Sequence, residues 1–300
     1  MNPIVKGYYA DPEARIYDGK CWVFCTLSYP PYTPLKNTDL FSYEDQCWFD
    51  AFVSEDFVTW KKVDKVLTLT DLSWGTHALW APSQFKYKNK YYLTFSSNDI
   101  QEDNQLGGLG IAEALTPEGP YRDVLGRPLV GNFINGAQPI DVHAYIEENA
   151  VYLFYGGWGN CNLVKMNDTL DGFVPDNLGK IFKNVTPKGY VEAPFMMKKD
   201  NKYYFMWSEG DWTTADYRVV YAIADNLAGP FKPMGTVLKQ DGKLATGSGH
   251  HSVVEDPKTG NYYIFYHRRS IGEENPFKRE LCMDQLVFND DGTIAPVTMS

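Results

Sequence analysis

Four residues of the chain share one position relative to an aromatic strand that follows them. Asp11, Asp141 and Glu192 each stand eleven residues before the aromatic residue that opens such a strand, and Trp80 stands at the same distance before another. The opening aromatic residues are Trp22, Tyr91, Tyr152 and Tyr203. A carboxylate at the head of an apolar strand is unfavourable unless it has a partner or a task. The recurrence marks three acids and one tryptophan as candidate functional residues.

Carboxylates that are crowded into one pocket favour acid–base chemistry. Proximity raises the pKa of one member while the other stays ionised. The protonated group can give its proton to a leaving oxygen, and the ionised group can take a proton from water. With an aromatic face beside them for a sugar ring, the pattern favours hydrolysis of a glycosidic bond. The third carboxylate is expected to orient the acid and keep its pKa high.

The elements that must position these residues are short strands. Apolar and aromatic runs separated by Gly, Asn, Asp and Pro fill the sequence, and helical periodicity is almost absent, which predicts an all-β fold. Five aromatic strands recur at intervals of roughly 50 to 70 residues, which suits the four-stranded antiparallel blades of a β-propeller. The sequence therefore predicts a single five-bladed domain over residues 1–300. The five strands contain Cys21-Trp22-Val23-Phe24, Tyr91-Tyr92-Leu93-Thr94-Phe95, Tyr152-Leu153-Phe154-Tyr155, Tyr203-Tyr204-Phe205-Met206-Trp207 and Tyr262-Tyr263-Ile264-Phe265-Tyr266.

The first strand of every propeller blade lines the central channel. Equivalent positions on different blades therefore meet at one mouth of that channel. We expect the three acids and the tryptophan to face one another there. In the fifth blade the hairpin turn is longer, so the matching residue lies somewhere within Gly249-His250-His251.

Composition restricts the class of partner. The chain has 300 residues, of which 44% are hydrophobic and 15% aromatic, and this is ample for a large buried core. Its 38 acidic and 28 basic residues give a net charge of −10, which disfavours binding to nucleic acid or to an anionic membrane. A neutral ligand is the natural expectation, and an oligosaccharide or polysaccharide would be one if the carboxylates act on a glycosidic bond. The sequence does not indicate an oligomeric state.

Cysteine usage bears on the compartment. Five cysteines stand at irregular spacing among apolar residues, so we expect buried free thiols rather than a disulfide framework. They are Cys21, Cys25, Cys47, Cys161 and Cys282. No apolar run approaches the roughly 18 residues of a membrane span, and the first residues lack the features of a signal peptide. A cytoplasmic location is favoured; a periplasmic or secreted location is the alternative if a leader has been removed.

The chain resembles glycoside hydrolase family 43, whose five-bladed propeller enzymes include arabinofuranosidases, xylosidases and arabinanases. The resemblance covers the whole chain and rests on one short motif in each blade. Each motif is weak alone, but their order and their placement blade by blade are specific. The motifs are Tyr9-Ala10-Asp11-Pro12, Trp80-Ala81-Pro82, Pro139-Ile140-Asp141, Val191-Glu192-Ala193-Pro194 and Gly249-His250-His251-Ser252.

The resemblance implies an inverting hydrolase in which Asp11 is the general base, Glu192 the general acid, and Asp141 a modulator of the acid. Inversion needs roughly 6.5 to 9.5 Å between the acid and base carboxyl groups, so that water fits between the sugar and the base. An α-L-arabinofuranosidase that releases a terminal sugar from plant-type polysaccharide or oligosaccharide is favoured. A β-D-xylosidase or related exo-glycosidase of the same family is the alternative.

The same resemblance implies three further contacts. Trp80 would line the sugar subsite, and an arginine of the last blade, Arg269 in preference to Arg268, would reach the acid and the sugar. His250 would lie at the channel centre, where relatives often hold a calcium ion or a water cluster. No cofactor is required, and a structural calcium there would be ligated mostly by water, because one histidine supplies few of its six to eight ligands.

Loops are expected to shape the pocket. The inserts 28–42 and 99–110 are long enough to close one end of a groove, which favours release of a terminal sugar over cleavage within a chain. Aromatic residues outside the blade strands are candidates for the rim of the pocket. They are Tyr29, Tyr32, Phe49, Trp74, Trp158 and Trp212.

Structural roles are the alternatives for individual residues. Asp11 before Pro12 would suit a turn, Asp141 a hydrogen-bonded carboxylate, Trp80 blade packing, and His250 a core histidine. Glu209 is the reserve candidate for the acid. The alternative function of another class is a non-catalytic carbohydrate-binding propeller, which has no reason to keep three carboxylates at one offset. Fructan-cleaving propellers are a third possibility, but their Asn-Asp-Pro and Arg-Asp-Pro motifs are missing.

Overall fold

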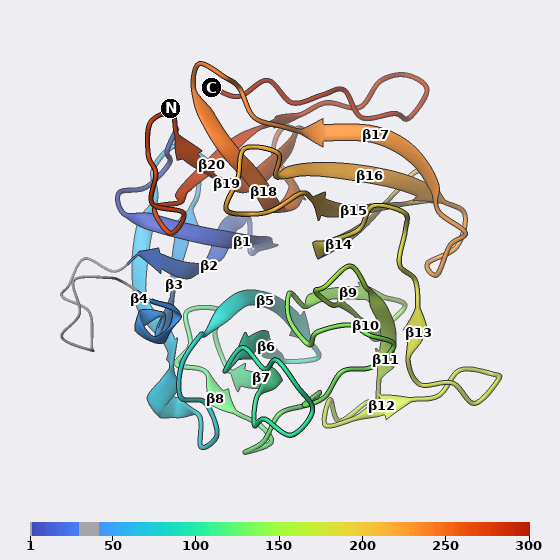
Figure 1. The fold of residues 1–300 in the computed structure, drawn as a ribbon. Helices are drawn as coiled ribbons and strands as arrows, with labels where there is room; N and C mark the ends of the chain where they lie inside the picture. The colour runs from blue at the N-terminus through green and yellow to red at the C-terminus, as the bar shows by residue number, and fades with distance from the viewer. Residues whose placement is uncertain (1, 30–41) are drawn as a thin grey trace.

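The aromatic hairpins form five sheets arranged around a centre, as the computed structural model shows for residues 2–29 and 42–300 (Figure 1). The predicted five-bladed β-propeller of antiparallel blades is confirmed. Each innermost strand contacts the innermost strands of both neighbouring blades, so the ring is closed. The described helices are two short 3₁₀ turns, η1 (Tyr43–Asp45) and η2 (Leu69–Asp71), and neither could cross a membrane.

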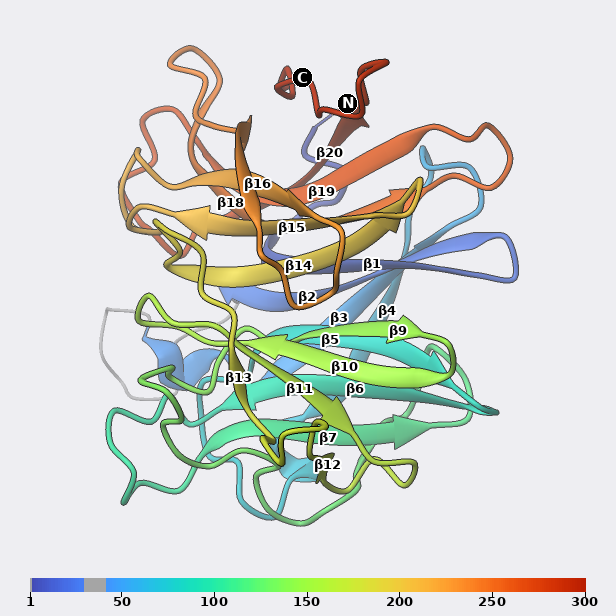
Figure 2. The ribbon, with the colours of Figure 1, turned by 90° about the vertical axis from the view of Figure 1, so that its right-hand side faces the viewer.

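Each blade runs outward from its innermost strand in chain order, and Figure 2 shows the same sheets from the side. Blade 1 contains β1 (Tyr8–Tyr17), β2 (Lys20–Tyr29), β3 (Trp48–Ser54) and β4 (Lys61–Thr68). Blade 2 contains β5 (Trp80–Tyr87), β6 (Lys90–Ser97), β7 (Gly108–Ala114) and β8 (Arg122–Asp123). Blade 3 contains β9 (His143–Glu147), β10 (Ala150–Tyr155) and β11 (Asn162–Met166), with β12 (Phe173–Val174) and β13 (Lys183–Asn184) both paired to β11 as its outer edge.

Blades 4 and 5 complete the ring. Blade 4 contains β14 (Glu192–Lys199), β15 (Lys202–Glu209), β16 (Arg218–Ala224) and β17 (Lys232–Leu238). Blade 5 contains β18 (Ala245–Glu255), β19 (Tyr262–Ser270) and β20 (Glu280–Leu286). The N-terminal segment lies along β20, where the Ile4 N–H donates to Leu281 O (3.0 Å) and the Met283 N–H donates to Asn2 Oδ1 (2.9 Å). This segment takes the outer position of blade 5, so both ends of the chain hold the ring shut.

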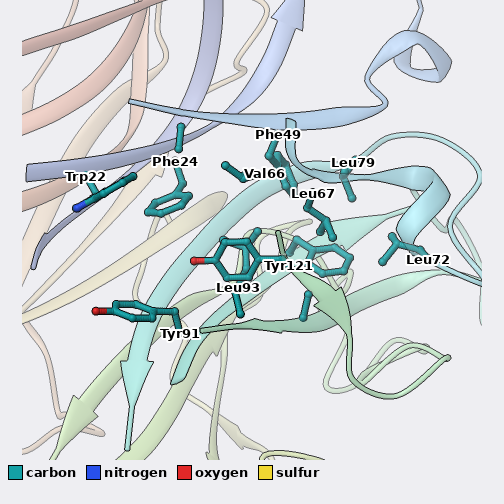
Figure 3. Packing of buried hydrophobic residues seen from close by; sticks show 14 of the residues in the cluster. Trp22, Phe24, Phe49, Val66, Leu67, Leu72, Leu79, Tyr91, Leu93 and Tyr121 are labelled. Atoms are coloured by element: carbon teal, nitrogen blue, oxygen red, sulfur yellow. The ribbon is translucent and has the colours of Figure 1, made fainter. Parts of the chain in front are cut away.

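Alternating apolar side chains hold neighbouring blades together. Along β2, Trp22 and Phe24 face blade 2, whereas Cys21, Val23 and Cys25 face blade 5, because successive side chains of a strand point to opposite faces. Figure 3 shows the cluster between blades 1 and 2, in which Phe24, Leu93 and Tyr121 pack side by side. Five such clusters fill the five blade interfaces. All five cysteines are free thiols, and all but Cys47 are buried.

Every innermost segment carries one non-glycine residue with positive φ at the same mouth of the propeller. These residues are Asp11 (φ 52°), Ala81 (48°), Asp141 (53°), Ala193 (58°) and His250 (37°). In blades 1, 2, 4 and 5 the strand register shifts at this point, as it does in a β-bulge. Left-handed backbone is unfavourable for such residues and persists only where neighbouring structure fixes it.

The backbone N–H of each bulge residue is bound by the preceding blade. Ala81 donates to Thr26 Oγ1 (2.8 Å), Asp141 to Ser96 Oγ (3.2 Å), His250 to Ser208 Oγ (3.0 Å) and Asp11 to His267 Nδ1 (3.3 Å). In blade 3 the matching position is Gly156, the residue after β10, whose N–H donates to Ile140 O (2.9 Å). There the carboxylate of Asp141 itself accepts the Ala193 N–H (3.1 Å). A ring of five bonds therefore joins the blades at one mouth.

We expect Ser96→Ala to lower the free energy of unfolding by about 1–3 kcal/mol, because it leaves the buried Asp141 N–H without its acceptor. Urea titration of both proteins measures the difference. Ser73→Ala is the matched control, since the exposed Ser73 hydroxyl donates to Gly126 O and water can replace that bond. Equal stability of the two variants would contradict a structural role for the ring.

Candidate active site

A cavity of about 410 Å³ opens at the mouth that carries the bulges. It holds Asp11, Trp80, Asp141, Glu192 and His250, which the sequence analysis drew from all five blades. Its full lining is Asp11, Tyr43, Gln46, Trp80, Asp99, Gln101, Gln138, Ile140, Asp141, Trp158, Glu192, Trp212, His250 and Arg279. Residues far apart in the sequence therefore meet in one polar pocket.

The bulges place these side chains in two ways. Asp11, Asp141 and His250 are themselves bulge residues, whereas Trp80 and Glu192 immediately precede the bulge residues Ala81 and Ala193. The constant spacing of eleven therefore does not mark equivalent positions. All four hairpins pair in the same register, but the aromatic residue used for counting is the third residue of β2 and β10 and the second residue of β6 and β15. Both positions face the cavity, since the bulge turns successive residues toward it.

Asp11 lies among cationic and imidazole groups. Its Oδ1 is 3.4 Å from Arg279 Nη1, 3.3 Å from His250 Nδ1 and 3.4 Å from His267 Nδ1. Burial alone would raise the pKa of Asp11, but these neighbours, Arg279 above all, outweigh burial and hold it well below its usual range. Burial lowers the pKa of both histidines, to about 4 for His267. At neutral pH both imidazoles are therefore largely uncharged, and the positive charge beside Asp11 is that of the Arg279 guanidinium. Asp11 is ionised at this pH.

Glu192 and Asp141 have the opposite tendency. Burial, opposed by a hydrogen bond from Tyr217 and assisted by the Asp11 charge, raises the pKa of Glu192 to about 7. Burial and the charges of Glu192 and Asp11 raise the pKa of Asp141. Asp141 is tied to the segment of the acid, because its Oδ2 accepts the N–H of Ala193, the residue after Glu192. Near neutral pH the pocket therefore holds an ionised Asp11 and a pair of carboxyl groups, Asp141 and Glu192, that retains a proton.

His250 lies at the floor of the cavity between two of the acids. Its Nδ1 is 3.3 Å from Asp11 Oδ1 and 3.6 Å from Asp141 Oδ2. Among residues 2–29 and 42–300, no group of three or more His, Cys, Asp or Glu side chains is arranged to hold a metal ion. Calcium prefers six to eight oxygen ligands, and these side chains do not form such a shell. The metal role of His250 stays a prediction, and no chemical step here depends on it.

Trp80 forms part of an aromatic wall. Its ring lies 5.0 Å from that of Tyr43, and its indole N–H donates to Gln46 Oε1. Trp212 continues the wall, with its ring 6.4 Å from Tyr43 and under the Arg279 guanidinium at 5.0 Å. Trp158 lines the cavity as well, and its ring is 4.8 Å from Phe133. An aromatic face beside carboxylates suits a sugar ring.

The other rim candidates divide between the core and the rest of the surface. Phe49 and Trp74 are buried in the cluster between blades 1 and 2. Tyr29 packs against Tyr8 at 5.9 Å and is not among the cavity residues. Tyr32, with most of the insert 28–42, lies outside the described residues. From the insert 99–110, Asp99 and Gln101 line the cavity.

The two arginines of the sequence analysis lie outside the cavity lining. Arg269 donates from Nη2 to Thr214 O (3.2 Å), and Arg268 donates from Nη1 to Ser300 O (2.9 Å). The arginine of blade 5 that lines the cavity is Arg279, next to β20. Glu209, the reserve candidate for the acid, does not line the cavity. Its Oε2 forms an ion pair with Arg218 Nη2 at 2.8 Å. Arg279 follows Phe277-Lys278 in a loop, so no strand periodicity pointed to it.

Two further residues touch the acids from behind the cavity. Tyr217 donates from its hydroxyl to Glu192 Oε1 (2.8 Å), and His267 accepts the Asp11 N–H. His267 directly precedes Arg268 and Arg269 in the sequence, and Tyr217 stands one residue before β16. The His267 contact joins blade 5 to blade 1, whereas the Tyr217 contact lies within blade 4, and sequence spacing encodes neither.

Comparison with known proteins identifies the class. The family model for glycosyl hydrolases family 43 matches residues 1–294. A β-D-galactofuranosidase of Aspergillus niger is 36% identical over 100% of this chain and 85% of its own length. A β-xylosidase of Xylanibacter ruminicola is 25% identical over 97% of both chains. The solved structure of an α-L-arabinofuranosidase from Clostridium thermocellum superposes with a TM-score of 0.77 at 25% identity, covering 97% of this chain and 94% of that one.

The propeller and its pocket of carboxylates thus define a glycosidase. The chain belongs to glycosyl hydrolases family 43.

The opposed pKa shifts predict how the rate depends on pH. Glu192 must be protonated to act as an acid, and its pKa is about 7, so kcat/KM should fall as the pH rises through about 7. Asp11 must be ionised, and its lowered pKa keeps it so down to acidic pH. The measurement is kcat/KM on an aryl glycoside from pH 4 to pH 9. A rate that is constant up to pH 9 would contradict the acid role.

Removing the Arg279 charge should weaken the base. In Arg279→Ala the pKa of Asp11 rises, so the acidic limb of kcat/KM moves to higher pH and the maximum falls by about tenfold or more. Arg269→Ala is the comparison, because Arg269 was the arginine expected from the sequence. If Arg269→Ala moved the acidic limb further than Arg279→Ala did, Arg269 would be the arginine that serves the base.

Proposed function

We propose that this protein is an inverting exo-glycosidase that releases a terminal furanosyl residue, with α-L-arabinofuranosides as its first substrates. One observation carries the proposal: within a single cavity, neighbouring positive and imidazole groups lower the pKa of Asp11 against burial, whereas burial raises the pKa of Glu192. Two carboxyl groups whose pKa values are driven apart are the signature of an acid and a base in one reaction. A sugar-binding propeller without turnover would not need this separation.

The proposed reaction is a single displacement. Asp11 takes a proton from a water molecule, whose oxygen bonds to the anomeric carbon of the sugar. The bond from that carbon to the leaving oxygen breaks, and Glu192 gives its proton to that oxygen. Asp141, which stays close to the acid through the Ala193 N–H, keeps the pKa of Glu192 raised when it carries charge. The products are a free sugar of inverted configuration and a shortened chain.

The size of the cavity supports release of a terminal sugar. Its volume of about 410 Å³ lies near the lower end of the roughly 300–1,000 Å³ typical of small-molecule sites. Asp99 and Gln101 from one loop, together with Trp158 from another, bound it on the side of blades 2 and 3. A pocket of this size holds the end of an oligosaccharide or polysaccharide rather than a long stretch of it.

A terminal β-D-galactofuranosyl residue is the second candidate substrate. It is supported by the whole-length similarity to the galactofuranosidase of Aspergillus niger. Both sugars have a five-membered ring, and the galactose form carries a longer exocyclic chain with an additional hydroxyl group. The carboxylate of Asp99 and the amide of Gln138, 3.0 Å apart in the cavity wall, offer a polar surface for such a hydroxyl.

A panel of 4-nitrophenyl glycosides tests the substrate class. The expected order is α-L-arabinofuranoside first, then β-D-galactofuranoside, with β-D-xylopyranoside and β-D-galactopyranoside slower. Proton NMR of the first product should show the inverted anomer. Retention of configuration would contradict the mechanism. If the xyloside were cleaved fastest, the preferred substrate would be a six-membered sugar ring and not a furanoside.

Glu192→Gln should reduce kcat on an unactivated oligosaccharide by about 10²- to 10⁴-fold, because the amide cannot donate the proton that the leaving oxygen needs. Binding of the sugar, measured by calorimetry, should remain. Glu209→Gln is the matched control, since Glu209 lies outside the cavity and pairs with Arg218. An unimpaired Glu192→Gln enzyme would remove Glu192 from the mechanism.

A further inference from the structure

The acid Glu192 has a buried partner behind the cavity. Tyr217 is 1% exposed and stands just before β16. Its hydroxyl lies 2.8 Å from Glu192 Oε1. Tyr217 does not line the cavity, so it cannot meet a substrate. Any effect that it has on the reaction must pass through the carboxyl group that it contacts.

The direction of this hydrogen bond follows from its neighbours. The backbone N–H of His250 can only donate, and it donates to Ser208 Oγ (3.0 Å). The Ser208 hydroxyl also favours the Tyr217 oxygen as an acceptor, which lowers the pKa of Tyr217 against the larger effect of burial, and the Tyr217 hydroxyl donates to Glu192 Oε1. A donor on Oε1 makes that oxygen the acceptor of the carboxyl group. The acidic proton therefore resides on Oε2.

The Tyr217 ring is held so that its hydroxyl cannot swing away. On one side it stacks on His267, with centroids 5.8 Å apart and planes 11° apart. On another side it lies against Gly249, where an added Cβ would stand 2.1 Å from Tyr217 Cε1. Gly249 is therefore the residue that leaves room for the ring. His267 also binds the backbone of Asp11, so the stack spans from the base to the acid.

We propose that Tyr217 is a positioning residue for the general acid: its fixed hydroxyl occupies Oε1 of Glu192 and so presents the proton on Oε2 to the leaving oxygen. This proposal rests on the glycosidase function proposed above. The Ser208 hydroxyl orients the Tyr217 proton, and the bulge at His250 orients Ser208. The backbone of blade 5 thus influences the acid of blade 4 through the buried hydroxyl groups of Ser208 and Tyr217.

Other groups also act on Glu192 and must be held constant in a test. A hydrogen bond from Tyr217 lowers the pKa of Glu192 against the larger effect of burial, so its loss should raise that pKa further. The titratable and charged groups that face Glu192 are Asp11 of β1, Tyr43 of η1, Asp141 before β9, Tyr190 before β14, Asp211 after β15 and Arg279 before β20. Tyr217→Phe leaves all of them in place.

The experiment compares Tyr217→Phe with the parent on two glycosides of the same sugar, one with a 4-nitrophenol leaving group and one with methanol. Methanol needs the proton of the acid, whereas 4-nitrophenol leaves with little help. We expect kcat on the methyl glycoside to fall on the order of tenfold, with a much smaller loss on the 4-nitrophenyl glycoside and little change in KM. The alkaline limb of the pH profile should move to higher pH.

Two further variants separate this role from a structural one. Tyr121→Phe removes another buried hydroxyl, which donates to Pro117 O (3.0 Å) far from the acid, and should leave both rates unchanged. Ser208→Ala should shift the alkaline limb in the same direction as Tyr217→Phe. Equal losses on both leaving groups with an unmoved alkaline limb would overturn the proposal. A parent enzyme that cleaved none of the glycosides would instead overturn the proposed function.

Discussion

The hydrogen bond from each bulge N–H to the preceding blade is the constraint on which the rest of the structure depends. Four of the acceptors are side chains on the second strand of a blade, namely Thr26, Ser96, Ser208 and His267. Because each bond fixes a left-handed residue, it also fixes the direction in which that residue or the one before it points. The carboxylates converge on the cavity because the same local distortion is repeated in every blade.

The exception in this ring explains the place of the third acid. Gly156 stands where the other blades carry an acceptor side chain, and a Cβ there would lie 2.2 Å from Asn160 O. No side chain fits, so the Ala193 N–H turns to the Asp141 carboxylate. This bond holds Asp141 beside the segment that carries Glu192. The third carboxylate of the cavity is thus part of the joint between blades 3 and 4.

Much of the fold and site could be predicted from the sequence because both depend on periodic features. The aromatic strands mark five blades, and Asp11, Asp141 and Glu192 stand out because acids at strand heads are unusual. The equivalence of the four positions could not be predicted, since the aromatic residue is the third residue of the second strand in blades 1 and 3 and the second residue in blades 2 and 4. Arg279 and Tyr217 were missed because each lies next to a strand, in a segment without periodicity. Each acts through a residue distant in sequence, Arg279 through Asp11 of blade 1 and Tyr217 through Glu192 of its own blade.

The bond between Asp141 and Ala193 bears on how this family can lose activity over evolutionary time. A lineage that came to use the propeller only to hold sugars could replace Glu192 without leaving a backbone N–H unpaired, because the described hydrogen bond of its carboxyl group comes from the Tyr217 side chain. Replacing Asp141 by a residue without an acceptor would leave a buried amide unpaired. Sequences of inactive descendants should therefore retain an acceptor at residue 141 after the acid itself has drifted.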